Sequence, residues 1–343
     1  MDNVSTQNRG LSYKLALVAV VLAFTVVLLG VYTRLVDAGL GCPDWPGCYG
    51  FLSVPDESHE IAAAEEAFPH APVEAHKAWP EMIHRYFAGS LGLLIAALAI
   101  IGFVNSRSKS GKKNEQPLIL SYALLGIVVF QAALGMWTVT LGLLPIIVMG
   151  HLLGGFITLT LLLVLFLNIR HGNPVAWASP IRSLALLGVV IVFAQIILGG
   201  WTSANYAAII CTDFPTCQGS LVPPLDFSGA FTIRTEGVNN YLGGHLGNDA
   251  RVTIHWMHRL GALITALFLI FLIVKLFITG WKKFALWVML VLIAQISLGI
   301  SNVVLSLPLP VAVAHNGVAV LLLMSLAALV HYSGLKKTVT RFK

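Results

Sequence analysis

The chain has 343 residues, of which 57% are hydrophobic and only 10% are charged, and its mean hydropathy is +0.84. Soluble domains carry about 25% charged residues, so this composition excludes a soluble fold and a disordered chain. The net charge is only +6, and the basic residues lie at the ends of apolar stretches, which argues against a nucleic-acid-binding surface. We therefore predict an all-α polytopic membrane protein.

Eight stretches are long and apolar enough to cross a hydrocarbon core about 30 Å thick, which takes about 20 helical residues. In chain order they are 13–33, 80–104, 118–140, 148–168, 183–204, 254–278, 284–306 and 311–332. The first stretch is too long for the core of a signal peptide, and no small-residue cleavage site follows it. We therefore expect it to be a span like the other seven.

The charged residues predict how the chain is oriented. Of the 21 lysines and arginines, 15 lie in the two tails and in the loops after the second, fourth and sixth spans. The opposite side has two long loops, about 34–79 and 205–253, which hold most of the acidic residues and all four cysteines. Cytoplasmic loops carry the lysine and arginine excess. Both termini are therefore expected in the cytoplasm.

The chain contains an internal repeat. Four groups of residues recur. The recurring features are Leu29-Gly30 as Leu198-Gly199, Cys42 and Cys48 as Cys211 and Cys217, Ile83-His84-Arg85 as Met257-His258-Arg259, and Gln131, Leu134-Gly135 and His151 as Gln295, Leu298-Gly299 and His315. Each copy has four spans, an even number, so both copies enter the membrane in the same direction. We predict two tandem, same-orientation four-helix bundles, residues 1–170 and 171–343, each with a site of its own between facing helices.

Four histidines lie near the beginnings of the even-numbered spans: His84, His151, His258 and His315. Those spans run inward from the outer side, so all four imidazoles are expected near the outer face. Ionisable groups within spans are costly and mark function, and imidazole pairs in an apolar bundle suit haem iron. The alternative is a histidine that only hydrogen-bonds a neighbouring helix, but recurrence of the positions favours haem. Zinc is less favoured, because no further ligand except His255 accompanies them.

One carboxylate distinguishes the two halves. Glu81 lies one helical turn before His84, on the same face, whereas the equivalent position in the second half is His255. A carboxylate at one site only suggests proton-coupled chemistry there and electron handling at the other. Alternatively, Glu81 serves as an acidic first-turn residue after Pro80.

An arginine follows the first histidine of each pair. Arg85 and Arg259 are either partners of a haem propionate, through charge-assisted hydrogen bonds, or topological anchors that reach to the interface.

The cysteines form two closely spaced pairs on the exported side, where oxidation is available. Two local disulfides, Cys42 with Cys48 and Cys211 with Cys217, are the simplest of the three pairings. A redox-active role and a zinc site built from all four thiolates are alternatives. The acidic stretch 56–74 of the first outer loop receives no function and is expected to be solvated.

The chain resembles the haem A synthase family. The resemblance is carried by Glu81-Met82-Ile83-His84-Arg85, by His151 at the start of the fourth span, by His258-Arg259 and by His315. The duplicated eight-span layout and the outer cysteine pairs match as well. It covers essentially the whole chain except the tails and the inserts of the long loops.

The resemblance implies an oxidoreductase of the bacterial inner membrane that converts the C8 methyl group of haem O to the formyl group of haem A by successive hydroxylations. It implies that His84 and His151 hold the substrate haem, that Glu81 is the catalytic carboxylate, and that His258 and His315 ligate a haem b cofactor. A haem O synthase, cytochrome oxidase assembly factors and an electron-transfer partner are implied as partners, alongside the lipid bilayer and without nucleic acid.

Two other functions compete with this interpretation. A membrane cytochrome b would carry electrons across the bilayer and would need haems near both faces, but all four histidines are expected near one face. A disulfide-generating quinone reductase would explain the cysteines, but it leaves the histidines without a role.

Overall fold

The computed structural model describes residues 10–107, 117–174 and 179–335. Eight of its helices are long and apolar enough to cross a membrane, and the described ranges contain no β-strand beyond two isolated bridges. The eight are α1 (Leu11–Leu35), α3 (Ala75–Arg107), α4 (Leu118–Thr140), α5 (Pro145–His171), α6 (Pro180–Ala204), α8 (Asn248–Ile278), α9 (Lys282–Val304) and α10 (Leu309–Ser333). The prediction of an all-α membrane protein with eight spans is confirmed.

Two spans begin earlier than their apolar stretches. Helix α3 begins at Ala75 and α8 at Asn248, because both helices include polar sequence that hydropathy does not mark. Pro80 therefore lies inside α3, where its carbonyl accepts a hydrogen bond from Thr33 Oγ1 of α1 at 3.2 Å. The alternative in which Glu81 belongs to the first turn of its helix is wrong, because that turn contains no acidic residue.

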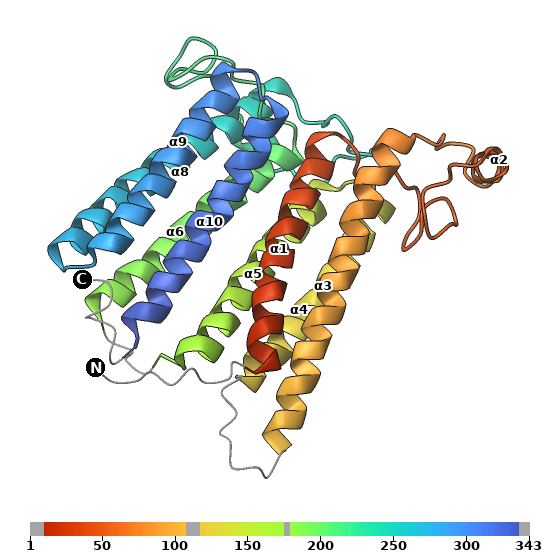
Figure 1. Ribbon diagram of the computed structural model, residues 1–343. Coiled ribbons are helices and arrows are strands. Elements are labelled where there is room, and N and C mark those ends of the chain that lie inside the picture. Colours follow the sequence, from red (N-terminus) through yellow and green to blue (C-terminus); the bar gives the residue numbers. More distant parts are fainter. Residues whose placement is uncertain (1–9, 108–116, 175–178, 336–343) are drawn as a thin grey trace.

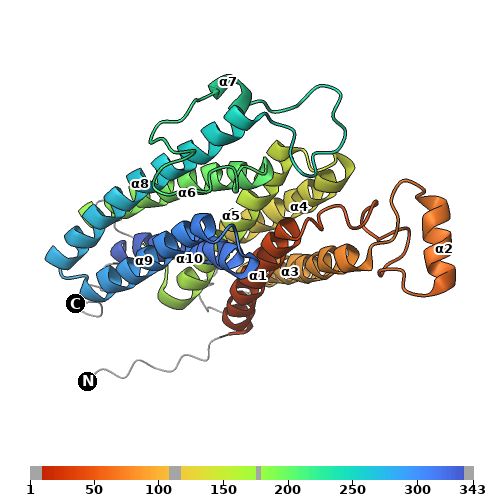
Figure 2. The ribbon, with the colours of Figure 1, turned by 90° about the horizontal axis from the view of Figure 1, so that it is seen from above.

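The spanning helices form two groups with the same pattern of neighbours. In the first group α1 contacts α3 and α5, and α4 contacts the same two helices. In the second, α6 contacts α8 and α10, and α9 contacts those two. Figures 1 and 2 show the groups side by side, joined through α1, α5, α6 and α10. This arrangement is consistent with two tandem four-helix bundles.

Residues at equivalent positions of the repeat meet at the end of the junction near the disulfide loops. Arg34, in the last turn of α1, donates to the Ser203 carbonyl at 2.8 Å and to Tyr206 Oη at 2.6 Å. The Tyr206 hydroxyl donates to Asp37 at 2.9 Å. Arg34 and Ser203 are 169 residues apart, and so are Asp37 and Tyr206. Each residue thus faces its own equivalent, as at a two-fold interface.

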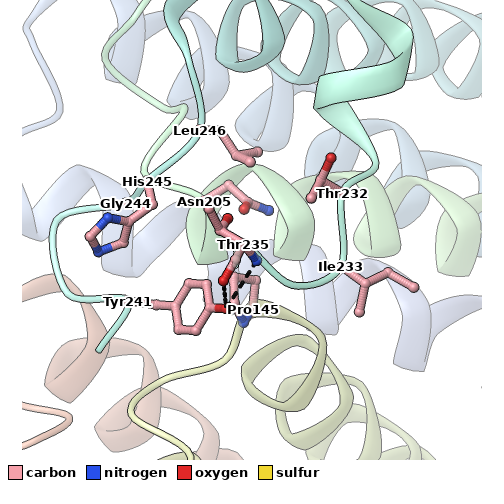
Figure 3. Close-up of a pocket in the computed structure, with 9 residues that line it drawn as sticks. All are labelled: Pro145, Asn205, Thr232, Ile233, Thr235, Tyr241, Gly244, His245 and Leu246. Carbon is pink, nitrogen blue, oxygen red and sulfur yellow. Dashed lines mark hydrogen bonds between the residues drawn. The ribbon is translucent and has the colours of Figure 1, made fainter. Parts of the chain in front are cut away.

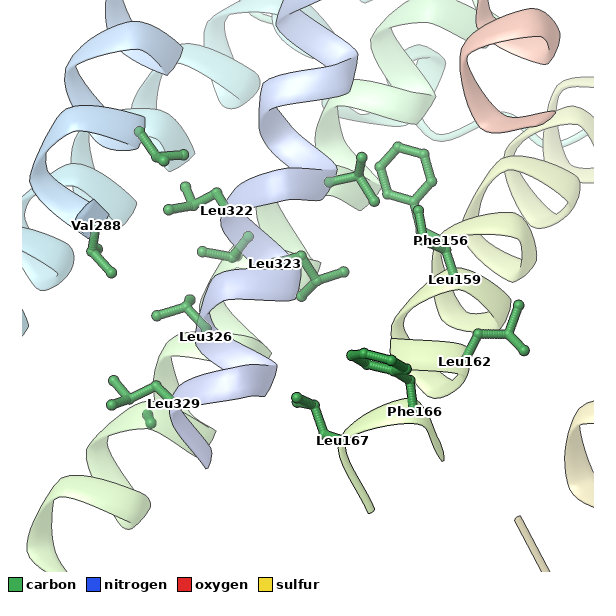
Figure 4. Close-up of a cluster of buried hydrophobic side chains, with 14 of the residues drawn as sticks. Phe156, Leu159, Leu162, Phe166, Leu167, Val288, Leu322, Leu323, Leu326 and Leu329 are labelled. Atoms are coloured by element: carbon green, nitrogen blue, oxygen red, sulfur yellow. The ribbon is translucent and has the colours of Figure 1, made fainter. Parts of the chain in front are cut away.

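Large apolar side chains of α5 and α10 lie along the junction farther from the disulfide loops (Figure 4). Phe156, Leu159 and Leu162 of α5 are buried, as are Leu323 and Leu326 of α10. Because lipid tails are as apolar as leucine, close packing rather than water exclusion holds such helices together. The junction is therefore stabilised by polar contacts at the outer end and by packing below.

The first outer loop forms an ordered structure that we call the first outer cap, residues 42–73. It contains α2 (Ser58–Ala67), which begins with a capping box between Glu57 and Glu60. Ala64 of α2 is fully buried in a cluster with Cys42, Cys48 and Tyr49. Stretch 56–74 is therefore largely exposed, as expected, but part of it is a helix with one buried position rather than an irregular loop.

The second outer loop reaches across to the first group of helices. It contains α7 (Phe227–Ala230), whose Ala230 carbonyl accepts from Trp201 Nε1 at 2.8 Å. Farther along, the Tyr241 backbone N–H donates to the Gly142 carbonyl, between α4 and α5, at 2.7 Å. Figure 3 shows the shallow pocket beneath this crossing, where the Tyr241 hydroxyl is bonded to the backbone of Thr235.

Candidate functional site

The first histidine pair lies between facing helices of the first group. His84 is on α3 and His151 is on α5, and their ring centroids are 6.2 Å apart with planes at 89°. A metal ion bound to both imidazoles at about 2 Å each would separate the ring centroids by about 6 Å. The pair therefore has a spacing at which both imidazoles would hold one iron.

The second pair comes from the equivalent helices of the second group. His258 is on α8 and His315 is on α10, and they lie close enough to interact electrostatically. Within the described ranges, no three side chains from His, Cys, Asp and Glu gather as a metal site. Iron held by either pair would need the rest of its coordination from another group, and the four nitrogens of a porphyrin meet that need. The donor sets fit haem.

A glycine of a neighbouring helix faces each of the four rings. A Cβ atom at Gly30 would lie 2.8 Å from His84, and one at Gly199 would lie 3.0 Å from His258. The corresponding distances are 3.3 Å from Gly135 to His151 and 3.1 Å from Gly299 to His315. These glycines belong to the Leu-Gly pairs of the repeat. Their recurrence was visible in the sequence, but only the structure shows that they make room for imidazoles.

Glu81 lies beneath the first disulfide loop. Its side chain is 5% exposed and forms an ion pair with Arg85, one turn farther along α3. The backbone N–H of Cys42 donates to its other oxygen at 3.0 Å. In the second half, His255 takes this place and makes a 2.9 Å hydrogen bond with the Ala207 carbonyl. The structure thus places a buried carboxylate beside one histidine pair and an imidazole beside the other.

Both arginines bind the disulfide loops, a role that the sequence did not indicate. Arg85 donates to the Asp44 carbonyl at 3.0 Å and to the Gly47 carbonyl. Arg259 donates to the Asp213 carbonyl at 2.9 Å and to the Thr216 carbonyl at 2.6 Å. Only Arg85 has a carboxylate partner among the described residues. Arg259 keeps its positive charge without an ion pair there, and its Nε is buried with no hydrogen bond.

The four cysteines form two local disulfides, Cys42–Cys48 and Cys211–Cys217. Because no described cysteine is free, a zinc site built from four thiolates is not available. These pairs sit in the loops that Arg85 and Arg259 hold above the histidines.

An aspartate closes each disulfide loop. Asp44 accepts from the backbone N–H groups of Tyr49 and Gly50, at 2.6 and 2.9 Å. Asp213 accepts from those of Gln218 and Gly219, at 2.8 and 2.9 Å. The Thr216 hydroxyl and these N–H groups stabilise the carboxylate and lower the pKa of Asp213 to about 2. The sequence analysis did not single out either aspartate, although both recur with the cysteines.

Comparison with known proteins identifies the family. The model of the COX15-CtaA family, described as cytochrome oxidase assembly protein, matches residues 13–327. A heme A synthase of Shewanella oneidensis is 47% identical over 322 residues, which cover 92% of this chain and 95% of that protein. Heme A synthases of Mesorhizobium japonicum and Caulobacter vibrioides are each 27% identical, over 96% and 94% of this chain and 92% and 96% of theirs. The chain belongs to the COX15-CtaA family of cytochrome oxidase assembly proteins.

Proposed function

We propose that the chain is a haem A synthase, an oxidoreductase that converts the C8 methyl group of haem O to a formyl group by successive hydroxylations. The observation that carries this proposal is the His84–His151 pair, spaced for one iron, with buried Glu81 one helical turn from His84. The heme A synthase similarity over nearly the whole chain supports it.

The two pairs take different haems in this proposal. His84 and His151 hold the substrate haem O, and His258 and His315 ligate haem b. When bound, haem b supplies one-electron transfer. The position of all four histidines beneath the disulfide loops, at one end of the helices, argues against a cytochrome that carries electrons across the membrane.

Glu81 is the catalytic group. Oxidation of a methyl group to a formyl group removes C–H hydrogens, so protons have to leave an apolar site. The Glu81 carboxylate accepts a proton there, and its contacts with Arg85 and the Cys42 N–H connect it to the polar outer loop. Arg85 and Arg259 retain N–H groups beyond those on the loop carbonyls, because a guanidinium has five donors, and we assign these to the haem propionates.

The proposed location is a bacterial inner membrane with both termini in the cytoplasm and the haem sites toward the outer face. The excess of lysine and arginine at the ends opposite the disulfide loops supports this orientation. A haem O synthase supplies the substrate, cytochrome oxidase assembly factors receive the product, and an electron-transfer partner completes the reaction.

The substitution Glu81→Gln tests the reaction. Membranes with the variant are supplied with haem O, and the extracted haems are separated by chromatography. We expect haem O to remain bound while haem A falls to background. His255→Gln, at the equivalent position of the second half, is the matched control and should still form haem A. Wild-type amounts of haem A from the Glu81→Gln protein would rule out this role for Glu81.

A further inference from the structure

The two proposed haem sites differ in what contacts their histidines. In the second half, Gln195 Nε2 of α6 lies 3.0 Å from His258 Nδ1 and donates to the His258 carbonyl at 3.0 Å. Gln295 Nε2 of α9 lies 3.4 Å from His315 Nδ1 and 3.3 Å from His315 Nε2. Each histidine of the second pair therefore touches a side-chain amide from the helix beside it.

The first half has no such contact. The Nδ1 atoms of His84 and His151 are buried with no hydrogen-bond partner in the described chain. The backbone carbonyls of Val26 and Gln131 lie near these rings, and the backbone of Gln295 lies near His315 in the same way. The Gln131 amide packs against Gly154 of α5 instead.

The amide contact at His258 depends on two positions that both differ between the halves of the repeat. The repeat places Val26 where the second half has Gln195, and Phe87 where it has Gly261. A Cβ atom at Gly261 would collide with the Gln195 side chain. The missing side chain at Gly261 thus makes room for the amide, while the first half has two apolar side chains and no polar partner.

An amide at this place is suited to an axial ligand. A histidine that binds iron through Nε2 carries its proton on Nδ1, and an acceptor for that proton fixes the ring and raises its basicity. The Gln195 and Gln295 side-chain oxygens are both buried without a partner in the described chain. Since an amide carries donor and acceptor on one group, a turn of each amide would present its oxygen to Nδ1–H; at Gln195 the new hydrogen bond would replace the present one to the His258 carbonyl.

We infer that Gln195 and Gln295 are positioning residues that make the second half retain its haem, an inference that rests on the proposed function. Without an amide partner, His84 and His151 bind haem less tightly, so the first half exchanges substrate for product. The same four-helix unit thereby serves once as a permanent cofactor site and once as a turnover site.

The test replaces Gln195 by methionine, which keeps the length of the side chain and removes the amide. Purified holoprotein is mixed with apomyoglobin as haem acceptor, and haem b transfer is followed by absorbance. Because loss of an outer-shell partner typically costs 10–100-fold in affinity, we expect Gln195→Met to transfer haem b about 10–100-fold faster than wild type. Val190→Met, a lipid-facing change on the same helix, should leave the rate unchanged.

The midpoint potential separates positioning from simple packing. Loss of the hydrogen bond makes the imidazole a weaker donor and should raise the haem b potential in Gln195→Met. Gln195→Glu keeps an acceptor and should retain haem b at a potential below that of Gln195→Met. Gln295→Met provides the same test if Gln195→Met does not fold. Wild-type transfer rate and potential in the folded methionine variant would overturn the inference, whereas wild-type protein that purifies without haem would overturn the proposed function itself.

Discussion

At the residue scale, the site depends on four glycines as well as on its four histidines. Four glycines leave the space in which four imidazoles lie, and Gly30 is the tightest of them. Small residues at helix interfaces of membrane proteins ordinarily allow backbones to approach. Here the space is taken by a functional ring from the next helix, so a methyl group at such a glycine should act on haem binding.

Gly30→Ala should therefore weaken substrate binding. The new Cβ would lie 2.8 Å from His84 Cε1, so the ring has to shift from its place opposite His151. We expect haem O affinity to fall about 10–100-fold, measured by titration of the purified protein with haem O. Gly89→Ala is the control, because no atom lies within 4 Å of its Cβ position. Equal affinities for the two variants would contradict the prediction.

Asp213 predicts a pH dependence of the second disulfide loop. Its pKa is lowered from 3.8 to about 2, so its contribution to the stability of the loop is complete above pH 4 and is lost as the pH falls toward 2. Asp213→Asn should speed reduction of Cys211–Cys217 by a phosphine. The ratio of variant to wild-type rates should be constant above pH 4 and approach one near pH 2. A ratio that changes between pH 5 and pH 8 would exclude this mechanism.

At the element scale, each half combines the same helices with a different outer segment. The first outer cap folds α2 back over the disulfide loop whose Cys42 N–H contacts Glu81. The Tyr49 hydroxyl donates to the Pro72 carbonyl at 2.8 Å and holds the end of the cap in place. The cap is therefore joined to the buried Glu81 carboxylate through a short stretch of backbone.

A charge in the buried face of α2 should release the cap. Ala64 is fully buried, whereas Ala63 on the same helix is exposed. Ala64→Asp would bury an unpaired carboxylate, which costs several kcal/mol, and should make residues 52–74 sensitive to protease added outside the cell. Ala63→Asp should leave the wild-type cleavage pattern. Resistance of both variants would show that α2 does not depend on this packing.

At the scale of the whole molecule, the two halves are joined by equivalent residues and by leucine packing. Arg34 links them at the outer end through Ser203 and Tyr206, and the α5–α10 core links them below (Figure 4). Both histidine pairs lie toward the same end of the helices as this polar junction, so we expect the junction to influence how the two proposed haem sites are placed relative to each other.

Arg34→Leu should lower the stability of the joined molecule. Hydrogen bonds to a charged group contribute about 1.5–3 kcal/mol each, and the variant loses those to Tyr206 and Ser203. We expect a lower unfolding temperature of the purified protein in detergent, measured by intrinsic fluorescence. Tyr206→Phe loses only the hydroxyl contacts and should fall between Arg34→Leu and wild type. An unchanged unfolding temperature in both would mean that the core alone holds the halves together.

The sequence by itself determined the membrane class, the eight spans and the repeat. Those features depend on local properties: about 20 apolar residues make a span whatever lies beside it, and equal spacing shows duplication before any contact is known. The sequence also pointed to His84, His151, His258, His315 and Glu81 as candidates, because ionisable side chains are rare within spans. The helix extensions at Ala75 and Asn248 escaped it, since hydropathy does not mark helices that continue into polar sequence.

Only the tertiary structure decided which residues meet. Gln195 has no polar equivalent in the first half, so the repeat did not mark it, and its contact with His258 joins residues 63 positions apart. Arg85 binds the disulfide loop, and α2 buries one of its faces, because the first outer loop packs against α3. Neither contact follows from the order of residues along the chain. Contacts between helices join residues that are far apart in the sequence, so a pattern of residue types along the chain does not predict which of them meet.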